Sequence, residues 1–276
     1  SRCIKFTSFS YAFNFWWKFN QDVSVLPSNL IYLEFGIKFT KDVYVLPYNL
    51  SYLTFSFFFN QDVSKLPHGL THLTFGHYFN QDVSVLPHNL IHLTFGTYFN
   101  QDVSNLPKII THLTFGTHFN QDVSNLPKII THLTFGTNFN QDISKLPKII
   151  THLTLGFDFK QQTTFCSNVK YLRLDCNNTY IINSLPNSVE ELELDYNFNC
   201  SMDNLPTSIK KIVIDENSSY NKDLNCLPNF VEELHLNSDY KKRILNIPSN
   251  LKKIICSKNY PYINDFAMYK VKTRWI

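Results

Sequence analysis

The sequence has little charge, little glycine and no long apolar run, and each shortage excludes a class of protein. Only 17% of its 276 residues are charged and the formal net charge is +3, so a nucleic-acid or membrane-surface partner is not expected. No run of about 18 apolar residues is present, so no transmembrane helix is predicted. The six cysteines form no CxxC motif, which favours reduced thiols and a cytoplasmic protein.

The scarce glycines and prolines follow a regular spacing. Seven prolines recur every 20 residues from Pro27 to Pro147, and six of the seven glycines share one slot of the same period, from Gly36 to Gly156. Residues 101–120 and 121–140 differ only in their eighteenth position. A fixed period of this length predicts a solenoid and excludes most globular enzyme folds.

Each 20-residue unit carries a strand signature. In the regular units the pattern is apolar-x-x-apolar-x-apolar, as in Leu90, Leu93 and Phe95. Later units add an asparagine and give the leucine-rich signature L-x-x-L-x-L-x-x-N, in which each coil contributes one parallel strand. We therefore predict a β-rich, leucine-rich-repeat-like horseshoe of about 13 coils of ~20 residues, with one parallel sheet on the concave face and little helix.

The whole chain is expected to form one solenoid domain with four parts. They are an N-terminal cap or degenerate repeat at 1–18, regular repeats at 19–160, divergent leucine-rich repeats at 161–260 and a C-terminal cap at 261–276. In the last part Tyr262, Phe266 and Tyr269 share one helical face behind Pro261. The strands are expected from residues 13–15 onward, thirteen in all.

The period-2 pattern assigns the side chains of each strand to two faces. Leu33 and Phe35 point inward and residues 32 and 34 point outward. A second phenylalanine column, from Phe19 to Phe159 in steps of 20, is predicted to fill the far side of each coil. The repeated asparagines that begin at Asn20 are predicted to bond neighbouring coils, and the repeated aspartates to cap backbone turns.

The units resemble FNIP repeats, a leucine-rich variant of slime-mould and giant-virus proteins. The resemblance rests on FNQDVSVLPHNLIHLTFG and FNQDVSNLPKIITHLTFG and extends over about residues 13–260. Asp stands where the family usually has Pro after Asn-Gln. Family members often carry an N-terminal F-box that docks onto an SCF-type ubiquitin ligase, and no F-box helices precede residue 13. The resemblance thus implies a ligase link through a segment outside this chain, and a host cytoplasm or virion as the location.

One outward column is rich in histidine and tyrosine. It stands on the predicted concave face with neighbours ~4.8 Å apart, and threonines form the adjacent column. A stacked polar ladder is favoured over a metal site, which needs three or four converging ligands. A pH response is a further alternative, because close imidazoles resist joint protonation. The column is also part of the predicted partner-binding surface, and it comprises Tyr32, Tyr52, His72, His92, His112, His132 and His152.

The most variable slots follow each strand and hold exposed aromatic residues. Variation on a constant frame is how a binding surface diversifies, and exposed aromatic patches favour partner binding. The alternative is that some of these rings cover the coil edge and extend the core. With Tyr32 and Tyr52, one partner-binding patch is predicted to contain Phe57, Phe58, Tyr78 and Tyr98.

Charge gathers in the C-terminal units, where acidic and basic pairs alternate from strand to strand. Glu190 and Glu191 stand against Lys210 and Lys211, which predicts cross-strand ion pairs in a self-neutralising ladder, with a charged docking face as the alternative. Because His, Asp and Ser recur many times over, no single nucleophile–base set stands out. The sequence is not that of an enzyme, and no cofactor or metal is expected.

Two functions remain open from the sequence. The first is a protein-binding module that binds its partner through the concave face. With an F-box from a segment outside this chain, such a module would recognise substrates for an SCF-type ubiquitin ligase. The second is a structural scaffold, such as a component of a viral particle. The identity of the partner protein is not encoded in these columns.

Overall fold

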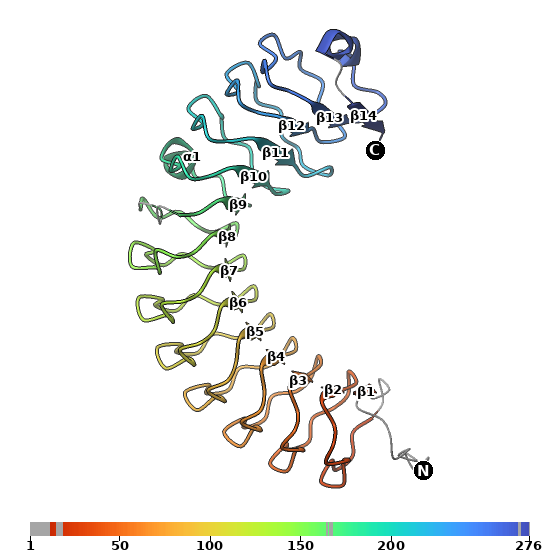
Figure 1. Ribbon diagram of the computed structural model, residues 1–276, viewed down its shortest axis with the longest axis vertical. Coiled ribbons are helices and arrows are strands. Elements are labelled where there is room, and N and C mark those ends of the chain that lie inside the picture. The colour runs from red at the N-terminus through yellow and green to blue at the C-terminus, as the bar shows by residue number, and fades with distance from the viewer. Residues whose placement is uncertain (1–11, 15–18, 164, 166–167, 270–271, 276) are drawn as a thin grey trace. The chain divides into compact units, whose positions relative to one another are not determined.

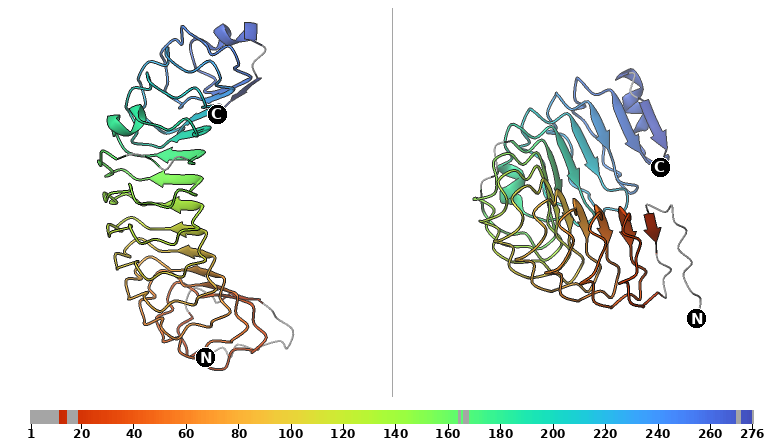
Figure 2. Two further views of the ribbon diagram at one scale, coloured as in Figure 1. Left: turned by 60° about the vertical axis from the view of Figure 1, so that its left-hand side comes forward. Right: turned by 60° about the horizontal axis from the view of Figure 1, so that its bottom comes forward.

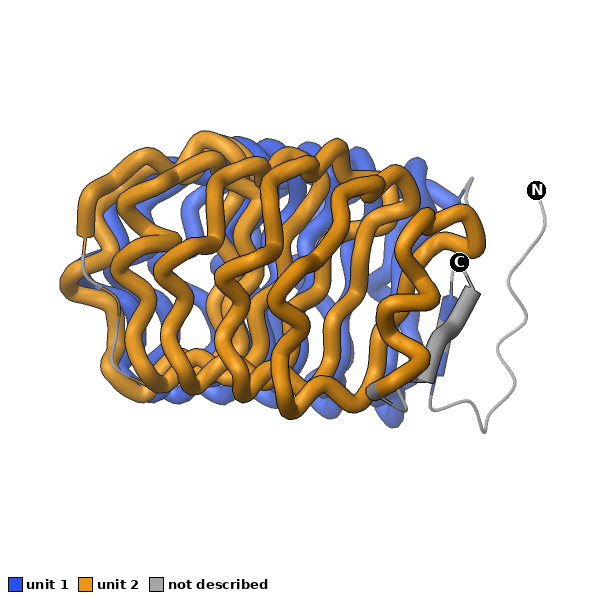
Figure 3. The backbone as a smooth tube through the Cα atoms, turned by 90° about the horizontal axis from the view of Figure 1, so that it is seen from above, with its two compact units in different colours: residues 1–136 blue, residues 137–276 orange. Residues whose placement is uncertain are grey.

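The structure, a computed structural model, describes residues 12–14, 19–163, 165, 168–269 and 272–275. The chain divides into two compact units, residues 1–136 and residues 137–276 (Figure 3). Most of the expected N-terminal cap at 1–18 lies outside the described residues, as do Cys3 and Cys166. No helix in the described part of the chain is long and apolar enough to span a membrane.

Unit 1 is built from short parallel strands that repeat every 20 residues (Figure 1). Strand order follows chain order, and paired residues stand 20 positions apart, as Tyr52 does from His72. From β2 to β7 each strand has three residues and is followed by a phenylalanine and then by a glycine or serine. The strands are β1 Ala12–Asn14, β2 Tyr32–Glu34, β3 Tyr52–Thr54, β4 His72–Thr74, β5 His92–Thr94, β6 His112–Thr114 and β7 His132–Thr134.

Two phenylalanine rings fill the core of each regular coil. Phe75 and Phe79 stack with their centroids 3.7 Å apart and their planes at 8°. Each ring is also parallel to its copy in the next coil, at 5.6 Å for Phe75 and Phe95. Both rings are buried, and burying a side chain of this size contributes about 2–3 kcal/mol. The aromatic stack is therefore a main source of stability in unit 1.

The predicted position of the second phenylalanine column is wrong. Phe79 does not lie on the far side of the coil but packs directly on Phe75. The cause is a tight turn after the strand, in which the Phe79 N–H donates to the Gly76 carbonyl at 3.3 Å. The chain then runs back through the buried Val83 and Leu86, which supply the rest of the coil's core.

Glycine after strands β4 to β7 is required by the close approach of adjacent coils, whereas the same slot after β3 holds Ser56. A Cβ atom at Gly96 would lie 1.9 Å from the carbonyl oxygen of Gly76, and one at Gly116 would lie 2.1 Å from that of Gly96. No side chain fits at such a distance. The regular glycine spacing therefore reflects a contact between backbones.

Polar side chains join the coils on the return segment, as predicted. The Asn120 N–H donates to Asn100 Oδ1 at 2.9 Å, and Gln121 Nε2 donates to the same oxygen at 3.1 Å. The aspartates cap local turns, since Asp102 accepts from the Ser104 N–H at 3.0 Å and from its hydroxyl at 2.7 Å. These bonds hold the pKa of the Asp102 carboxyl below its usual range.

Unit 2 continues the same design with longer strands and two short helices (Figure 2). Asn178 caps the first helix by accepting from the Ile181 N–H at 3.2 Å. The phenylalanine column becomes a tyrosine column, with Tyr220 and Tyr240 stacked at 6.4 Å. The elements are β8 His152–Leu155, β9 Tyr171–Leu174, α1 Thr179–Asn183, β10 Glu191–Leu194, β11 Lys211–Ile214, β12 Glu233–His235, β13 Lys253–Cys256, η1 Ile263–Tyr269 and β14 Lys272–Trp275.

The predicted fold class is confirmed: the described residues form a parallel-stranded, leucine-rich-repeat-like solenoid with little helix. The described part of the chain contains fourteen strands, one more than predicted. The addition is β14, which follows a 3₁₀-helix and pairs in parallel with β13. Phe266 of that helix is buried against Tyr260, with ring centroids 6.3 Å apart.

Candidate functional site

The outward side chains of β4–β7 form a stacked row that we call the histidine ladder: His72, His92, His112 and His132. Neighbouring rings lie 4.3 Å apart for His72 and His92, and 4.1 Å apart for each of the next two pairs. Interplanar angles between 11° and 21° make the rings nearly parallel. The strand spacing dictates this stack, because identical residues stand in register on adjacent parallel strands.

The other outward residues predicted for this surface extend the ladder or lie apart from it. Tyr52 stacks on His72 at 4.3 Å, and Tyr32 lies tilted against Tyr52 at 6.3 Å. The Tyr32 hydroxyl donates to Glu34 at 3.0 Å. In unit 2, His152 packs against Tyr171 at 5.5 Å. The column thus consists of half-buried histidines with the more exposed Tyr52 beside them.

In the histidine ladder, each histidine that follows a threonine contacts the hydroxyl oxygen of that threonine. Thr71 Oγ1 lies 2.9 Å from His72 Nδ1, and the same contact measures 2.8 Å at Thr111 and His112. Burial, together with the nearby rings of His92 and His112, lowers the pKa of His72 below its ordinary value. The neutral imidazole is thus the favoured form in the fold.

A second aromatic row follows the strands, and we call it the rim stack: Phe58, Tyr78, Tyr98 and His118. Phe58 and Tyr78 are parallel within 9° at 5.5 Å, Tyr78 and Tyr98 within 3° at 5.1 Å, and Tyr98 and His118 within 13° at 4.6 Å. The Lys38 ammonium lies over the outer face of Phe58 at 5.1 Å. Phe58, Tyr78 and Tyr98 are each about 40% exposed.

The predicted aromatic residues form two groups instead of one patch. Phe57 joins the rim stack, meeting Phe58 edge to face at 4.9 Å and lying parallel to His77 at 4.4 Å. Tyr32 and Tyr52 belong to the strand face, because their side chains leave the strand itself and the rim residues leave the following turn. Sequence reasoning noted the variable slots of His77 and His118 but did not choose these residues for the site. Their periodic spacing of 20 from other aromatic residues was the available signal.

The strand face of unit 2 is charged and largely self-neutralised. Lys210 pairs with Glu190 at 2.7 Å, Lys211 with Glu191 at 3.1 Å, and Lys253 with Glu233 at 2.7 Å. These contacts confirm the cross-strand pairs predicted from the alternating signs. Because most of these groups are well exposed, each pair contributes little to stability.

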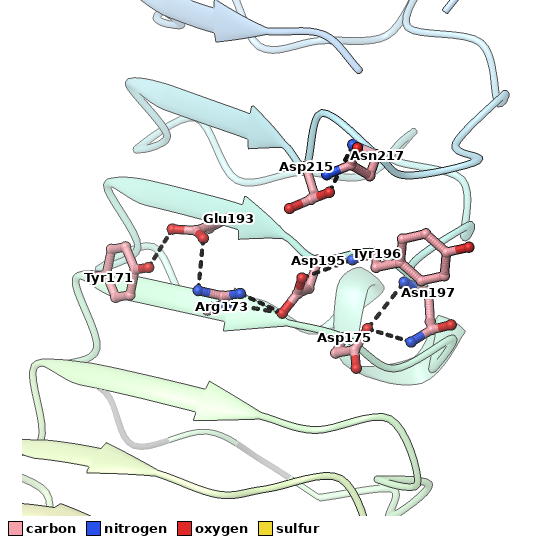
Figure 4. A network of polar contacts seen from close by, with 9 residues as sticks. All are labelled: Tyr171, Arg173, Asp175, Glu193, Asp195, Tyr196, Asn197, Asp215 and Asn217. Atoms are coloured by element: carbon pink, nitrogen blue, oxygen red, sulfur yellow. Dashed lines mark hydrogen bonds and ion pairs between the residues drawn. The ribbon is translucent and has the colours of Figure 1, made fainter. Parts of the chain in front are cut away.

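One polar network in unit 2 was not predicted. Arg173 lies between Glu193, at 3.1 Å, and Asp195, at 2.6 Å, and the Tyr171 hydroxyl donates to Glu193 (Figure 4). Asp175 accepts from both the backbone and the side-chain amide of Asn197. The network fixes neighbouring coils to one another, so its evident role is structural.

Hollows on the described surface are shallow. One of about 440 Å³ lies beside Lys108 and Lys128 on the return side of unit 1. Another of about 200 Å³ lies on the strand face of unit 2, over Val213 and Ile255 with Glu193 and Asp215 at its margin. Neither gathers a nucleophile, a base and an orienting group.

The described residues hold no group of three or more His, Cys, Asp or Glu side chains positioned to bind a metal ion. The histidine ladder shows why, since parallel stacked rings do not converge on one point. Cys176, Cys200, Cys226 and Cys256 are free thiols, which agrees with the reduced state predicted for them.

Comparison with known protein families and structures yields matches of two kinds. The family model described as FNIP Repeat matches residues 59–98, 82–118, 119–158, 159–197, 177–216 and 220–259. Comparison with curated protein sequences finds no match. Among solved structures, CroV588, a circular leucine-rich-repeat protein from a giant virus, is 35% identical with a TM-score of 0.62. That match covers 90% of this chain and 46% of CroV588, so the chain spans about half of its length.

Two bacterial structures share the fold at lower identity. The internalin InlF of Listeria monocytogenes is 18% identical with a TM-score of 0.55, over 89% of this chain and 80% of its own. YopM from Yersinia enterocolitica is 19% identical with a TM-score of 0.52, over 84% of this chain and 56% of its own. At these identities the likeness concerns the fold alone.

Proposed function

The chain belongs to the FNIP repeat family, and on that premise we propose that it is a module that binds another protein through unit 1. The proposed surface comprises the histidine ladder with Tyr32 and Tyr52 on the strand face, and Phe57 with the rim stack beside it. Solenoid folds present extended surfaces of this kind to their partners. We assign the chain no catalytic step.

The rim stack is the observation that carries the proposal. Three large aromatic side chains, Phe58, Tyr78 and Tyr98, are exposed in consecutive coils. Each is held parallel to its neighbour, so a partner that covers them loses little side-chain entropy on binding. Buried aromatic anchors of this kind dominate the binding energy of protein interfaces.

A pair of tyrosine variants tests the proposal. We expect Tyr78→Ala with Tyr98→Ala to reduce capture of the partner at least about tenfold, since each anchor at an interface centre is worth about 1–2 kcal/mol or more. The matched control is Tyr44→Ala with Tyr48→Ala, which removes two tyrosines that are also exposed but lie outside the rim stack. Partners recovered from the native source are quantified by mass spectrometry at neutral pH.

The comparison between the two double variants decides the result. Loss of the same protein in the rim variant and its retention in the control support the proposal. Equal recovery with both variants and with the unmodified chain contradicts it. Circular dichroism confirms that both variants keep the strand signal of the parent chain.

We extend the proposal to substrate recognition in an SCF-type ubiquitin ligase located in the cytoplasm. Support comes from the FNIP repeats alone, since the F-box of such proteins would lie outside this chain. Co-purification of the complete gene product tests the extension: SCF-type ligase subunits are expected among its partners, and their absence contradicts it.

The rival proposal is a scaffold of a viral particle. It draws support from the 35% identity to CroV588, a giant-virus protein. If the chain is a scaffold, it should be abundant in purified particles. The rim variant should then recover the same proteins, in the same amounts, as the unmodified chain. The two proposals therefore predict opposite results for Tyr78→Ala with Tyr98→Ala.

A further inference from the structure

The threonines beside the histidine ladder contact one particular nitrogen of each ring. The Thr71 hydroxyl donates to the Ser51 carbonyl at 3.1 Å and also lies 2.9 Å from His72 Nδ1. The Thr71 oxygen therefore occupies Nδ1 of His72 in either neutral tautomer, as acceptor from Nδ1–H or as donor to a bare Nδ1. The threonine contact is made by Nδ1 and not by Nε2.

The same contacts recur three coils further along the ladder. Thr131 Oγ1 donates to the Thr111 carbonyl at 3.3 Å and lies 2.9 Å from His132 Nδ1. In the imidazolium form both ring nitrogens are donors, so Nδ1–H can donate to the threonine oxygen while the threonine hydroxyl donates to the carbonyl. Both threonine contacts are therefore compatible with a charged ring in the same position, and Nε2–H is then a donor as well.

The ladder lies in a part of the chain that is rich in histidine and poor in carboxylates. Eight of the ten histidines fall between residues 60 and 136, together with three lysines. The four acidic residues of this stretch are Asp62, Asp82, Asp102 and Asp122, and each accepts hydrogen bonds from the serine two positions later on the return segment. In this stretch, side chains that are positive when protonated therefore outnumber the carboxylates, and the carboxylates lie away from the strands.

Apart from Glu34, the titratable residues around the ladder are histidine, tyrosine and lysine. The outward positions of β4–β7 hold only histidine and threonine, and those of β3 hold Tyr52 and Thr54. Glu34 on β2 is engaged with Tyr32. In unit 2, His152 and Tyr171 occupy the equivalent outward positions of β8 and β9. The flanking slots before the strands hold His68, His88, Lys108 and Lys128, and those after the strands hold His77, Tyr78, Tyr98 and His118.

We propose that the histidine ladder is a binding site for an acidic peptide segment of a partner protein, which binds when the ladder is protonated and is released when it is neutral. The inference rests on the proposed protein-binding function of unit 1 and adds the chemistry of the partner. Carboxylates stay ionised below the pH at which imidazole gains its proton. An acidic segment lying along the ladder would offset the repulsion between imidazolium rings 4.1–4.3 Å apart.

A peptide fits this surface better than a nucleic acid does. Nucleic-acid sites are lined by lysine and arginine, which stay charged at neutral pH, whereas the outward positions of β3–β7 hold neither residue. The threonine column beside the ladder adds hydroxyl groups that can bond carboxylates. Binding to such a face must take up protons, so affinity rises as the pH falls.

The test uses a fluorescent deca-glutamate peptide and the whole chain, with anisotropy as the readout. We expect binding to be at least about tenfold tighter at about pH 5.5 than at about pH 7.5, because histidine changes charge in this interval. The ladder variant is His92→Gln with His112→Gln. The matched control is His68→Gln with His88→Gln. These two histidines are also 20 residues apart, but they lie in the segment before the strands and outside the ladder.

The outcomes separate this inference from its rivals. Binding that strengthens at low pH, is lost in the ladder variant and survives in the control supports it. No binding by the folded chain, unfolding of the parent chain at about pH 5.5 by circular dichroism, or equal loss in both variants overturns it. Tighter ladder-dependent binding of a single-stranded DNA 10-mer than of the peptide also overturns it.

A second readout needs no substitution. In the parent chain, titration of the histidine ring resonances by NMR should show ladder rings that gain protons when the peptide is added, and unchanged ladder titration contradicts the site. Failure of these experiments leaves the rim-stack test at neutral pH untouched. Failure of the rim-stack test, in turn, does not alter the expected peptide binding at low pH.

Discussion

At the scale of single residues, the tyrosine column of unit 2 contains one unsatisfied hydroxyl. The hydroxyls of Tyr240 and Tyr260 donate to the carbonyls of Lys222 and Lys242 at 3.1 and 2.9 Å. The Tyr220 hydroxyl is buried and has no partner in the structure. A buried polar group without a partner costs about 1–3 kcal/mol, so the hydroxyl of Tyr220 lowers stability while its ring stacks on Phe198 and Tyr240.

Tyr220→Phe should therefore stabilise unit 2. We expect the free energy of unfolding to rise by about 1 kcal/mol, because the ring keeps its stacking and the unsatisfied group is removed. Tyr240→Phe is the control, and we expect it to lower the free energy of unfolding by a similar amount since it breaks a made bond. Urea unfolding followed by circular dichroism measures both, and a loss of stability in Tyr220→Phe contradicts the interpretation.

At the scale of elements, the asparagine and glutamine hydrogen bonds between coils decide how strongly one coil is bound to the next. Asn100 Oδ1 accepts from the Asn120 N–H and from Gln121 Nε2. Asn100→Ala leaves that N–H without its partner, and we expect a loss of about 1–2 kcal/mol in the free energy of unfolding. Asn100→Asp retains the acceptor and should lose less.

The control for the Asn100 variants is Asn105→Ala, which changes an exposed asparagine five residues further along the same coil. Its unfolding midpoint in urea should match that of the parent chain. Equal losses of unfolding free energy for Asn100→Ala and Asn105→Ala would show that the hydrogen bonds of Asn100 between coils make no specific contribution to stability.

The histidine ladder gives the strand face a dependence on pH. Burial and the neighbouring His92 and His112 lower the pKa of His72 in the folded chain, whereas the unfolded chain keeps the ordinary value of about 6.5. Below that pH the unfolded state binds more protons than the folded state, so the free energy of unfolding falls as the pH falls. Above it, the full contribution is present.

His72→Gln should reduce this slope. Thermal unfolding at several pH values between about 5 and 7.5 measures it, because this interval brackets the ordinary pKa of histidine. We expect the parent chain to lose more stability on acidification than the variant does. Parallel losses in both proteins would show that other groups cause the acid sensitivity.

At the scale of the whole molecule, the sequence predicts what repetition dictates and misses what side-chain packing decides. The 20-residue spacing placed β2 to β7 correctly, since a solenoid pairs equivalent residues of successive coils. It also predicted the asparagine bonds and the Glu190–Lys210 contact. The position of Phe79 could not be inferred, because a turn of one residue more or less moves the ring between opposite sides of the coil.

The elements that depart from the 20-residue period could not be predicted from the sequence either. The strand β14 has the sequence Lys-Thr-Arg-Trp, which lacks the apolar alternation used to find the other strands, and only its pairing with β13 defines it. Helix α1 depends on the cap made by Asn178, in a unit that departs from the regular spacing. The separation of Tyr52 from Phe57 likewise depends on where the strand ends and the turn begins.

Because each coil contacts only its neighbours, the number of coils in unit 1 should be adjustable. Residues 101–120 and 121–140 are nearly identical, so deleting 101–120 joins equivalent ends and keeps the Phe–Phe stack, the asparagine bonds and the strand register. Stability in such arrays is close to a sum over repeats and their interfaces. We expect a folded chain with a cooperative transition and a modestly lower thermal midpoint. Deleting only 101–110 removes half a period, places polar residues in the core slots and should abolish cooperative unfolding. Similar behaviour of the two deletions, measured by circular dichroism, would contradict a solenoid whose coils interact only in sequence.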